Sequence, residues 1–537
     1  MSLPQPRKPR NLYTVNDDLV WIIEKSGYLD KILKYYPDKT GEECKMVLEL
    51  AGEIAGEIIA PHMSENDRYG EEHHTLAPGT IKAYKVLAEN GFIGLPLKSE
   101  LNLPFFVAMG AYELLAQADP ALMVRYGLSA GVAETLERFA TGEIKKKYLP
   151  GLLSGNDVGA MVLTEDGAGS DLGGILTKAT SNESDTFLGG TKQLISNCDA
   201  TIQLVLARDA DTFAETKGKM KGLSMYLVAT AENHDAVKNT RTEEKLGLHA
   251  SITGTIVYDN ARAHLIGEKG QGLKHMLHLM HTARLGVAAQ ALGVAQSAIV
   301  EANTYTRQRQ QFGKKLSELP AMQNILDDMS LTLLGMRALL YEAAFSVEKK
   351  NHCSYEEERK WSEKRANSLT FLSKYYLAEE CVRVCRLALQ VHGGYGYIKE
   401  YLPEQLLRDS LVFPIYEGTS QIQALTELKF LAKDGFTHVK RYSIDGVAHM
   451  LSPNADTRLL GKMERMLAGT LYRMYRKGSD TTQYHAERLT RMLANYEIVQ
   501  LVLKQPTRPL YGKLRTKLLP RLLASSIKEY EEVKRLE

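Results

Sequence analysis

One glutamate stands among apolar and turn-forming neighbours in the last third of the chain. Its segment, residues 413–419, reads FPIYEGT. A carboxyl group in such surroundings loses solvation of its charged form, so its pKa is expected to rise toward the range in which a general base works near neutrality. Gly418 permits a non-helical turn beside a ligand, and Thr419 and Gln421 add polar side chains. The pattern therefore predicts that Glu417 is a general base.

The wider stretch around Glu417 resembles the acyl-CoA dehydrogenase family of flavoproteins. Three motifs of that family follow one another here: HGGYGY at 392–397, the pair Arg408-Asp409, and IYEGTSQIQ at 415–423. The resemblance implies that Glu417 removes the pro-R α-proton of an acyl-CoA thioester while a β-hydride passes to N5 of FAD. Elementary chemistry agrees, because a carbonyl acidifies its α-proton and the carboxylate needs only desolvation and position. We therefore expect FAD as cofactor and an acyl-CoA as substrate.

A glycine-rich segment at 161–171, MVLTEDGAGSD, resembles a second signature of the family, with Asp166 where proline is usual. Hydroxyl groups bounded by glycines suit a backbone that closely approaches a flavin and its phosphates. The resemblance implies that Ser170 is shared between FAD and the pantetheine arm of the CoA thioester. It implies cofactor contacts from Met161, Leu163, Thr164, Gly169 and Ser170.

A third segment at 188–197, LGGTKQLISN, resembles the family's strand motif. By this resemblance Ser196 is the hydroxyl near flavin N5. Leu194 occupies the position that usually holds an aromatic residue over the outer edge of the flavin. Further on, His249 stands where the family has arginine, and we interpret it as a structural donor or an exposed residue rather than a catalyst.

Residues 285–302 carry apolar side chains at intervals of three and four, which predicts a core helix of a bundle. By resemblance Arg284 lies on the CoA side of the site. Ala283 occupies the position at which the long-branched and isovaleryl members carry their base. Because alanine cannot take a proton, Glu417 is the only base compatible with the family.

The segment RQRQQFGK at 307–314 resembles the end of that helix in the family. There Arg309 bonds the FAD pyrophosphate across a subunit interface, a role suited to a guanidinium facing phosphate oxygens. A second subunit implies a homodimer or homotetramer. Further cofactor contacts implied by the resemblance are Phe312, Gln390, Gly393, Gly394, Thr419 and Gln421. The implied substrate contacts are Ser170, Arg284, Tyr416 and Gly418.

The elements that position these residues follow from a periodicity that changes twice along the chain. Apolar residues recur at three and four before residue 150, alternate at period two between 202 and 258, and return to helical spacing from Gly272. We expect a mainly α protein with a central β domain. The expected parts are an N-terminal helical domain with an N-terminal extension (1–155), a small β-barrel (156–270), a four-helix bundle with the base (271–430) and an additional basic helical region (431–537).

Composition narrows the class of protein. With 537 residues, 44% hydrophobic and 25% charged, the chain is expected to form several globular domains. Its five cysteines are odd in number and lack a Cys-x-x-Cys pair, which argues against a disulfide framework and a metal site. No apolar run approaches the ~18 to 20 residues that span a bilayer, and the first residues lack the apolar core of a signal peptide. A cytoplasmic protein without membrane association is expected.

Charge is unevenly distributed. Residues 431–537 hold 20 Lys+Arg against 11 Asp+Glu, and the preceding residues hold 47 against 54. A basic helical surface can bind anionic lipid or nucleic acid, but an acidic body of complementary charge favours packing within the protein.

Three functions share the motifs described above. The first is a dehydrogenase that passes electrons to an electron-transfer flavoprotein, and the second is an acyl-CoA oxidase that returns them to oxygen. The third is an adaptive-response-type flavoprotein that binds nucleic acid, but those relatives carry tryptophan in the Trp-Glu-Gly form of the motif, where this chain has Tyr416. We expect the dehydrogenase, with no nucleic acid as partner. Arg125 is either a contact for a distal carboxylate of the acyl group, a surface residue or a structural donor.

Overall fold

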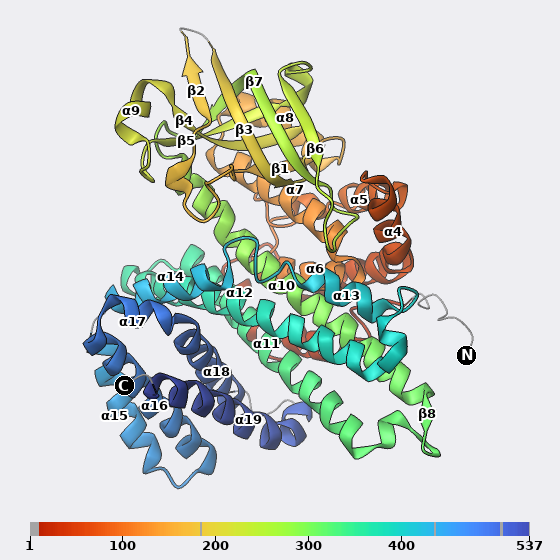
Figure 1. The fold of residues 1–537 in the computed structure, drawn as a ribbon, viewed down its shortest axis with the longest axis vertical. Coiled ribbons are helices and arrows are strands. Elements are labelled where there is room, and N and C mark those ends of the chain that lie inside the picture. Colours follow the sequence, from red (N-terminus) through yellow and green to blue (C-terminus); the bar gives the residue numbers. More distant parts are fainter. Residues whose placement is uncertain (1–9, 183–184, 434–435, 505–508, 536–537) are drawn as a thin grey trace. The chain divides into compact units, whose positions relative to one another are not determined.

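The computed structural model describes residues 10–182, 185–433, 436–504 and 509–535 (Figure 1). The chain divides into two compact units. The first contains residues up to Val15 and Asp38–Gly286, and the second contains Asn16–Pro37 and Val287–Glu537. Each unit is described by itself below.

The first unit opens with helices whose buried faces follow the predicted spacing. A capping box starts the first of them, since Thr40 accepts from the backbone N–H of Glu43 and the Glu43 carboxylate accepts from the backbone N–H of Thr40. Asp119 caps a later helix by accepting from the N–H groups of Ala121 and Leu122. The helices are α3 (Gly41–Glu53), α4 (Met63–His73), α5 (Pro78–Glu89), α6 (Phe105–Ala118), α7 (Pro120–Phe139) and α8 (Gly142–Leu153).

A small closed β-barrel follows in the first unit, as predicted. Its strand order is β1-β4-β2-β3-β7-β5, β5 also pairs with β4 to close the barrel, and β6 pairs with β7 (Figure 1). Every residue of β4 and β5 is buried, whereas the alternating pattern alone would leave one face exposed. The strands are β1 (Gly159–Val162), β2 (Lys178–Ser181), β3 (Thr186–Ser196), β4 (Ile202–Asp209), β5 (Leu223–Ala229), β6 (Val237–Thr242) and β7 (Thr253–Ile266), with the short helix α9 (Phe213–Thr216) between β4 and β5.

The second unit is built around a predicted helix bundle. Helix α10 (Gly272–Gln308) contains the boundary between the units and continues into the second. Arg337 of α11 donates to Gln296 of α10 at 2.9 Å, and α12 packs against α11 and α14. The bundle and its connections comprise α11 (Pro320–His352), α12 (Glu356–His392), α13 (Leu402–Ser410) and α14 (Ser420–Lys433), with the two-residue strands β8 (Gln310–Gln311) and β9 (Lys314–Lys315).

Two short helices near the N-terminus also belong to the second unit, α1 (Asp17–Glu24) and α2 (Tyr28–Leu33). Asp18 forms a 3.0 Å ion pair with Arg337, and the Tyr28 hydroxyl donates to Glu342 at 2.7 Å. Both partners lie on α11, so these contacts fix the first helices of the chain to the bundle. The helical periodicity of residues 17–33 does not reveal this grouping.

Where the structure describes it, the basic C-terminal region contains these further helices of the second unit: α15 (Phe436–Met450), α16 (Ala455–Lys477), α17 (Ser479–Tyr484), α18 (Ala486–Lys504) and α19 (Pro509–Lys534). Helix α16 stops at Gly478, whose φ of 88° only glycine adopts readily, and α17 begins at Ser479. The apolar faces of α16 and α18 are buried at Met463, Leu467 and Tyr496, among others. This region therefore has a packed interior of its own.

Helix α10 corrects the expectation that the chain has no run suited to a membrane. By length and composition it passes the usual test for a membrane-crossing helix, although 83% of the tested window is buried inside the protein. Such burial is typical of a core helix.

Candidate functional site

The predicted base lies in the loop between α13 and α14, and its backbone is unusual. Glu417 has a φ of 53°, in the left-handed region that residues with a side chain rarely adopt, and Gly418 follows with a φ of 87°. A non-glycine residue in this region costs about 1 to 3 kcal/mol, so surrounding contacts must hold it there. The strain marks Glu417 as a residue whose direction is fixed by the fold.

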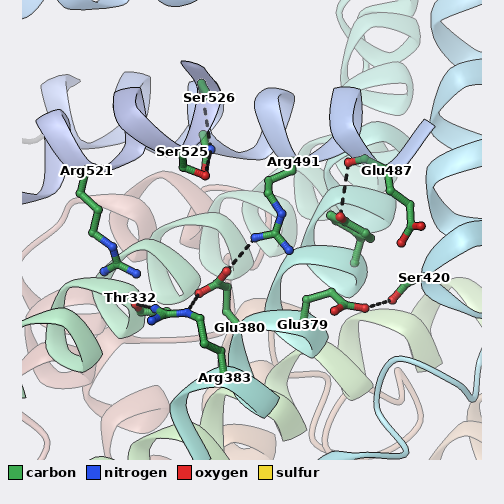
Figure 2. Close-up of polar contacts among 12 residues, drawn as sticks. Thr332, Glu379, Glu380, Arg383, Ser420, Glu487, Arg491, Arg521, Ser525 and Ser526 are labelled. Carbon is green, nitrogen blue, oxygen red and sulfur yellow. Dashed lines mark hydrogen bonds and ion pairs between the residues drawn. The ribbon is translucent and has the colours of Figure 1, made fainter. Parts of the chain in front are cut away.

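Side chains from two helices hold this loop by its carbonyl groups. Lys374 of α12, fully buried, donates from Nζ to the Gly418 carbonyl at 2.7 Å. Gln423 of α14 donates from Nε2 to the carbonyls of Glu417 and Gly418, both at 3.0 Å. The Ser420 hydroxyl donates to Glu379 of α12 at 2.6 Å (Figure 2). A Cβ on residue 418 would lie 2.6 Å from Gln423 Nε2, so the contact also requires glycine.

Along the chain Glu417 is flanked by Tyr416 and Gly418. The side chain is half-buried, and its Oε2 atom is shielded from solvent. The adjacent Tyr416 donates its hydroxyl proton to Gln290 of α10 and lies near the ring of buried Phe413. Burial, and then the charge of Glu417, raise the pKa of Tyr416 far above its ordinary value. Tyr416 therefore stays a neutral hydrogen-bond donor.

In the first unit the fold brings two predicted cofactor segments together. The Gln193 N–H donates to the Thr164 carbonyl at 2.9 Å, and the fully buried Lys192 donates from Nζ to the Leu163 carbonyl at 2.8 Å. Lys192 also forms a 2.8 Å ion pair with Glu165. Burial lowers the pKa of Lys192 to about 8 although the Glu165 charge opposes this effect. These contacts join the loop after β1 to strand β3.

The side chains that this junction presents suit a flat, partly apolar group with phosphates. Leu194 lies where the register between β3 and β7 shifts, has a φ of 57°, and is 63% exposed. Ser196, at the end of the same strand, pairs with Thr253 of β7. Gly169 and Ser170 are exposed in the loop that follows β1, the strand that contains Met161. An outward apolar side chain beside hydroxyls and an open glycine backbone is what the isoalloxazine end of FAD requires.

In the second unit the fold places Arg309 beside the glycine segment that follows α12. Its guanidinium lies 5.8 Å from the centre of the Tyr395 ring. Gly393 and Gly394 are exposed in that segment, next to exposed Gln390, and Gly393 has a φ of 59°. Phe312, at the turn between β8 and β9, is 90% exposed with a φ of 55°. A guanidinium beside exposed glycine backbone fits phosphate oxygens.

The remaining predicted contacts have separate surroundings. Arg284, in the part of α10 that belongs to the first unit, is buried. The Thr419 hydroxyl accepts from the Ile422 N–H at 3.3 Å, as a residue that caps α14 does. Gln421 is exposed and donates to Glu487 of α18 at 3.1 Å. The last contact links a predicted cofactor residue to the C-terminal region.

Two residues considered at the sequence level are structural. Arg125 is buried and forms a 3.0 Å ion pair with Asp199, so a carboxylate of the protein occupies its guanidinium. His249 receives contacts from both sides, with Nδ1 3.2 Å from Asp67 and Nε2 2.8 Å from the Lys245 carbonyl. These contacts support a structural role for both residues.

Sequence reasoning missed the residues that support the loop, namely Lys374, Glu379, Gln290 and Gln423. One signal for Lys374 was available, because it interrupts the apolar run FLSKYYLA at 371–378. A cation within such a run of a core helix is expected to have a partner.

Comparison with known families covers most of the chain. Three family models match consecutive segments: the N-terminal domain of acyl-CoA dehydrogenase at residues 41–156, its middle domain at 160–261 and its C-terminal domain at 270–431.

Similar proteins span nearly their full length on this chain. The caffeyl-CoA reductase–Etf complex subunit CarC of Acetobacterium woodii is 31% identical over 405 residues, which cover 73% of this chain and 99% of that protein. An acyl-CoA dehydrogenase of Bacillus subtilis is 32% identical over 402 residues, covering 73% and 98%. The crystal structure of an acyl-CoA dehydrogenase from Bacillus anthracis complexed with FAD superposes with a TM-score of 0.80 at 22% identity, covering 93% of this chain and 88% of that one.

Proposed function

Because this chain belongs to the acyl-CoA dehydrogenase family, FAD-dependent oxidoreductases that act on CH–CH bonds of acyl-CoA substrates, we propose that it converts an acyl-CoA to the 2-enoyl-CoA with Glu417 as the base. The observation that carries this proposal is the left-handed conformation of Glu417, held by Lys374 and Gln423. Such strain persists where the direction of a side chain matters.

The chain's residues have the following roles in this proposal. The Glu417 carboxylate takes the α-proton of the thioester, which the adjacent carbonyl acidifies. Tyr416 and Gly418 contact the substrate beside it, and Ser170 and Arg284 contact the CoA arm. Bound FAD supplies the acceptor for the β-hydride at N5.

The proposed cofactor contacts fall into two groups by unit. In the first unit they are the two segments joined at the Thr164 carbonyl, with Met161, Leu163, Thr164, Gly169, Ser170, Leu194 and Ser196. In the second unit Arg309 is the proposed partner of the pyrophosphate, with a second subunit receiving this contact. The other residues of that group are Phe312, Gln390, Gly393, Gly394, Thr419 and Gln421.

For the electron acceptor we propose an electron-transfer flavoprotein. The name of the Acetobacterium woodii relative places that protein in a complex with Etf, and this supports the choice over oxygen. The alternative acceptor is oxygen, which an acyl-CoA oxidase would use.

One experiment tests the reaction and the acceptor together. The purified flavoprotein is mixed anaerobically with a panel of straight-chain, branched, alicyclic, aromatic and dicarboxylic acyl-CoAs, and the flavin absorbance is followed. Bleaching by at least one member is expected, with reoxidation fast in the presence of electron-transfer flavoprotein and slow in air. Absence of bleaching by the whole panel would refute the reaction, and fast reoxidation by air would replace the dehydrogenase with the oxidase.

A further inference from the structure

Helix α18 lies in the C-terminal region, beyond the segment that the family model matches, yet it reaches the support of the catalytic loop. Arg491 of α18 donates to Glu380 of α12 at 2.8 Å, and Arg383 donates to the other oxygen of the same carboxylate at 2.7 Å (Figure 2). Glu380 is only 5% exposed. Burial alone would raise the pKa of Glu380, but the charges of Arg383 and Arg491 outweigh it and lower that pKa.

Two other contacts join α18 to the same stretch. The Tyr375 hydroxyl donates to the Glu487 carbonyl at 3.3 Å, and the Arg491 guanidinium lies 5.8 Å from the centre of the Tyr375 ring. The Glu487 carboxylate also accepts from Gln421, four residues after Glu417, at 3.1 Å. Helix α18 therefore contacts both α12 and the start of α14.

The stretch of α12 that receives α18 is the stretch that holds the loop. Lys374, next to Tyr375, donates to the Gly418 carbonyl, and Glu379, next to Glu380, accepts from Ser420. Figure 2 shows Glu379 directed to Ser420 and Glu380 directed to Arg491 from neighbouring positions of one helix. Residues 374–380 thus connect α18 to the loop that carries Glu417.

We propose that α18 is a positioning element for the reaction, with Arg491 and Glu487 as positioning residues that keep Glu417 in its strained conformation through α12 and Gln421. The catalytic part of this proposal rests on the proposed function, in which Glu417 is the base. Its geometric part stands without it, because the strain at Glu417 has to be balanced by contacts and α18 supplies the outer layer of them.

The test compares Arg491→Met with the control Arg473→Met. Arg473 lies in the same C-terminal region, where it contacts Tyr530 of α19. Both FAD-loaded variants are subjected to hydrogen–deuterium exchange without substrate, and exchange is read in peptides covering residues 411–423. We expect at least fivefold faster exchange there in Arg491→Met and less than twofold change in the control. Exchange within twofold of wild type in Arg491→Met, or an equal rise in both variants, would overturn the proposal.

A second readout separates positioning from general loosening. With the acyl-CoA that bleaches the wild-type flavin most rapidly, anaerobic flavin reduction at saturating substrate should slow about tenfold in Arg491→Met, and Arg491→Lys should recover part of the loss. Unchanged reduction in Arg491→Met would count against the proposal. If no acyl-CoA bleaches the wild type, the proposed function fails while the exchange result still decides the geometry. If Arg491→Met does not fold, Glu487→Ala is decided by the same exchange criterion.

Discussion

At the scale of the residue, the loop that carries the proposed base is held through its carbonyl oxygens. Lys374 donates to the carbonyl of Gly418 and Gln423 donates to the carbonyls of Glu417 and Gly418, and these contacts fix the backbone at the proposed base.

The first prediction concerns Lys374. Lys374→Met keeps the length and apolar stem of the side chain but leaves the Gly418 carbonyl without this donor, so we expect a loss of stability of about 1 to 3 kcal/mol. The midpoint of urea unfolding, followed by flavin fluorescence, measures it. Lys429→Met, at an exposed position of α14, is the control. Equal midpoints for both variants would show that the contact has no energetic weight.

Much of the site could be predicted from residue types, but its conformation could not. Gly418 indicated a turn, yet glutamate rarely adopts positive φ, so nothing in the sequence placed the strain on Glu417. The same holds for Leu194, whose exposure follows from a register shift between β3 and β7. Register is a property of strand pairing, and a single strand's pattern does not reveal it.

At the scale of the element, α14 carries a second buried carboxylate. Glu427 accepts from the Ser368 hydroxyl at 2.7 Å, and its Oε2 atom has no hydrogen-bond partner among the described residues. Burial raises the pKa of Glu427 from 4.5 to about 7. The group is therefore neutral in the folded protein under mildly acidic conditions and is ionised at a cost in alkaline ones.

The second prediction follows from the sign of this shift. Because the folded protein holds the Glu427 proton more tightly than the unfolded chain, stability falls as pH rises from about 4.5 to 7, by on the order of 3 kcal/mol. Glu427→Gln removes this dependence. Its thermal midpoint, relative to that of wild type, should therefore rise between pH 5 and pH 8. The exposed Glu400→Gln is the control and should follow wild type. Parallel pH profiles for wild type and Glu427→Gln would contradict the buried, protonated state.

Hydrophobic periodicity predicted whether a main element is a helix or a strand better than it predicted the unit to which the element belongs. The barrel, the bundle and the apolar faces of α16 and α18 follow from spacing, since spacing records which side of an element is buried. The assignment of α1 and α2 to the second unit depends on Asp18 and Tyr28 meeting α11, more than 300 residues away. The helical prediction from Gly272 onward also missed β8 and β9, which are too short to show a pattern.

At the scale of the whole molecule, the charge asymmetry of the sequence is used inside the second unit. Arg491 pairs with Glu380, Arg521 pairs with Asp328 at 2.9 Å, and Lys517 pairs with Asp327. Each pair joins a base of the C-terminal region to an acid of α11 or α12. Arg508 and the side chains of Lys513 and Arg515 lie outside the part of the chain that the structure describes. These pairs support packing as the role of the basic charge.

The third prediction is that a chain stopped before Leu431 becomes insoluble or fails to assemble. Helix α18 packs closely on α11, where a Cβ on Gly335 would lie 3.3 Å from Ile498, and its removal exposes this face and takes Arg491 from Glu380. Size-exclusion chromatography of both chains measures the effect. A soluble, active truncation with the oligomeric state of the full chain would refute the packing role, and tight duplex binding by the full chain at physiological salt would favour a nucleic-acid role.

The fourth prediction concerns assembly around the cofactor. Arg309→Ala removes a charge-assisted partner of phosphate worth ~1.5 to 3 kcal/mol, so FAD retention should weaken about tenfold or more. The flavin-to-protein absorbance ratio after dialysis measures it, with the exposed Arg307→Ala as control. A wild-type protein that is monomeric and carries full FAD would show that Arg309 does not act across a subunit interface.

The most direct measurement of the central claim is anaerobic flavin reduction by Glu417→Gln in a stopped-flow instrument. The substitution keeps the size and hydrogen-bonding capacity of the side chain but removes the base. With the acyl-CoA that bleaches the wild type, we predict a full complement of bound FAD and a reduction rate lower by several powers of ten, beyond the ~10² to 10⁴ usual for one acid–base group. Glu400→Gln should match the wild type. A Glu417→Gln rate within tenfold of the wild type would contradict the assignment of Glu417 as the base.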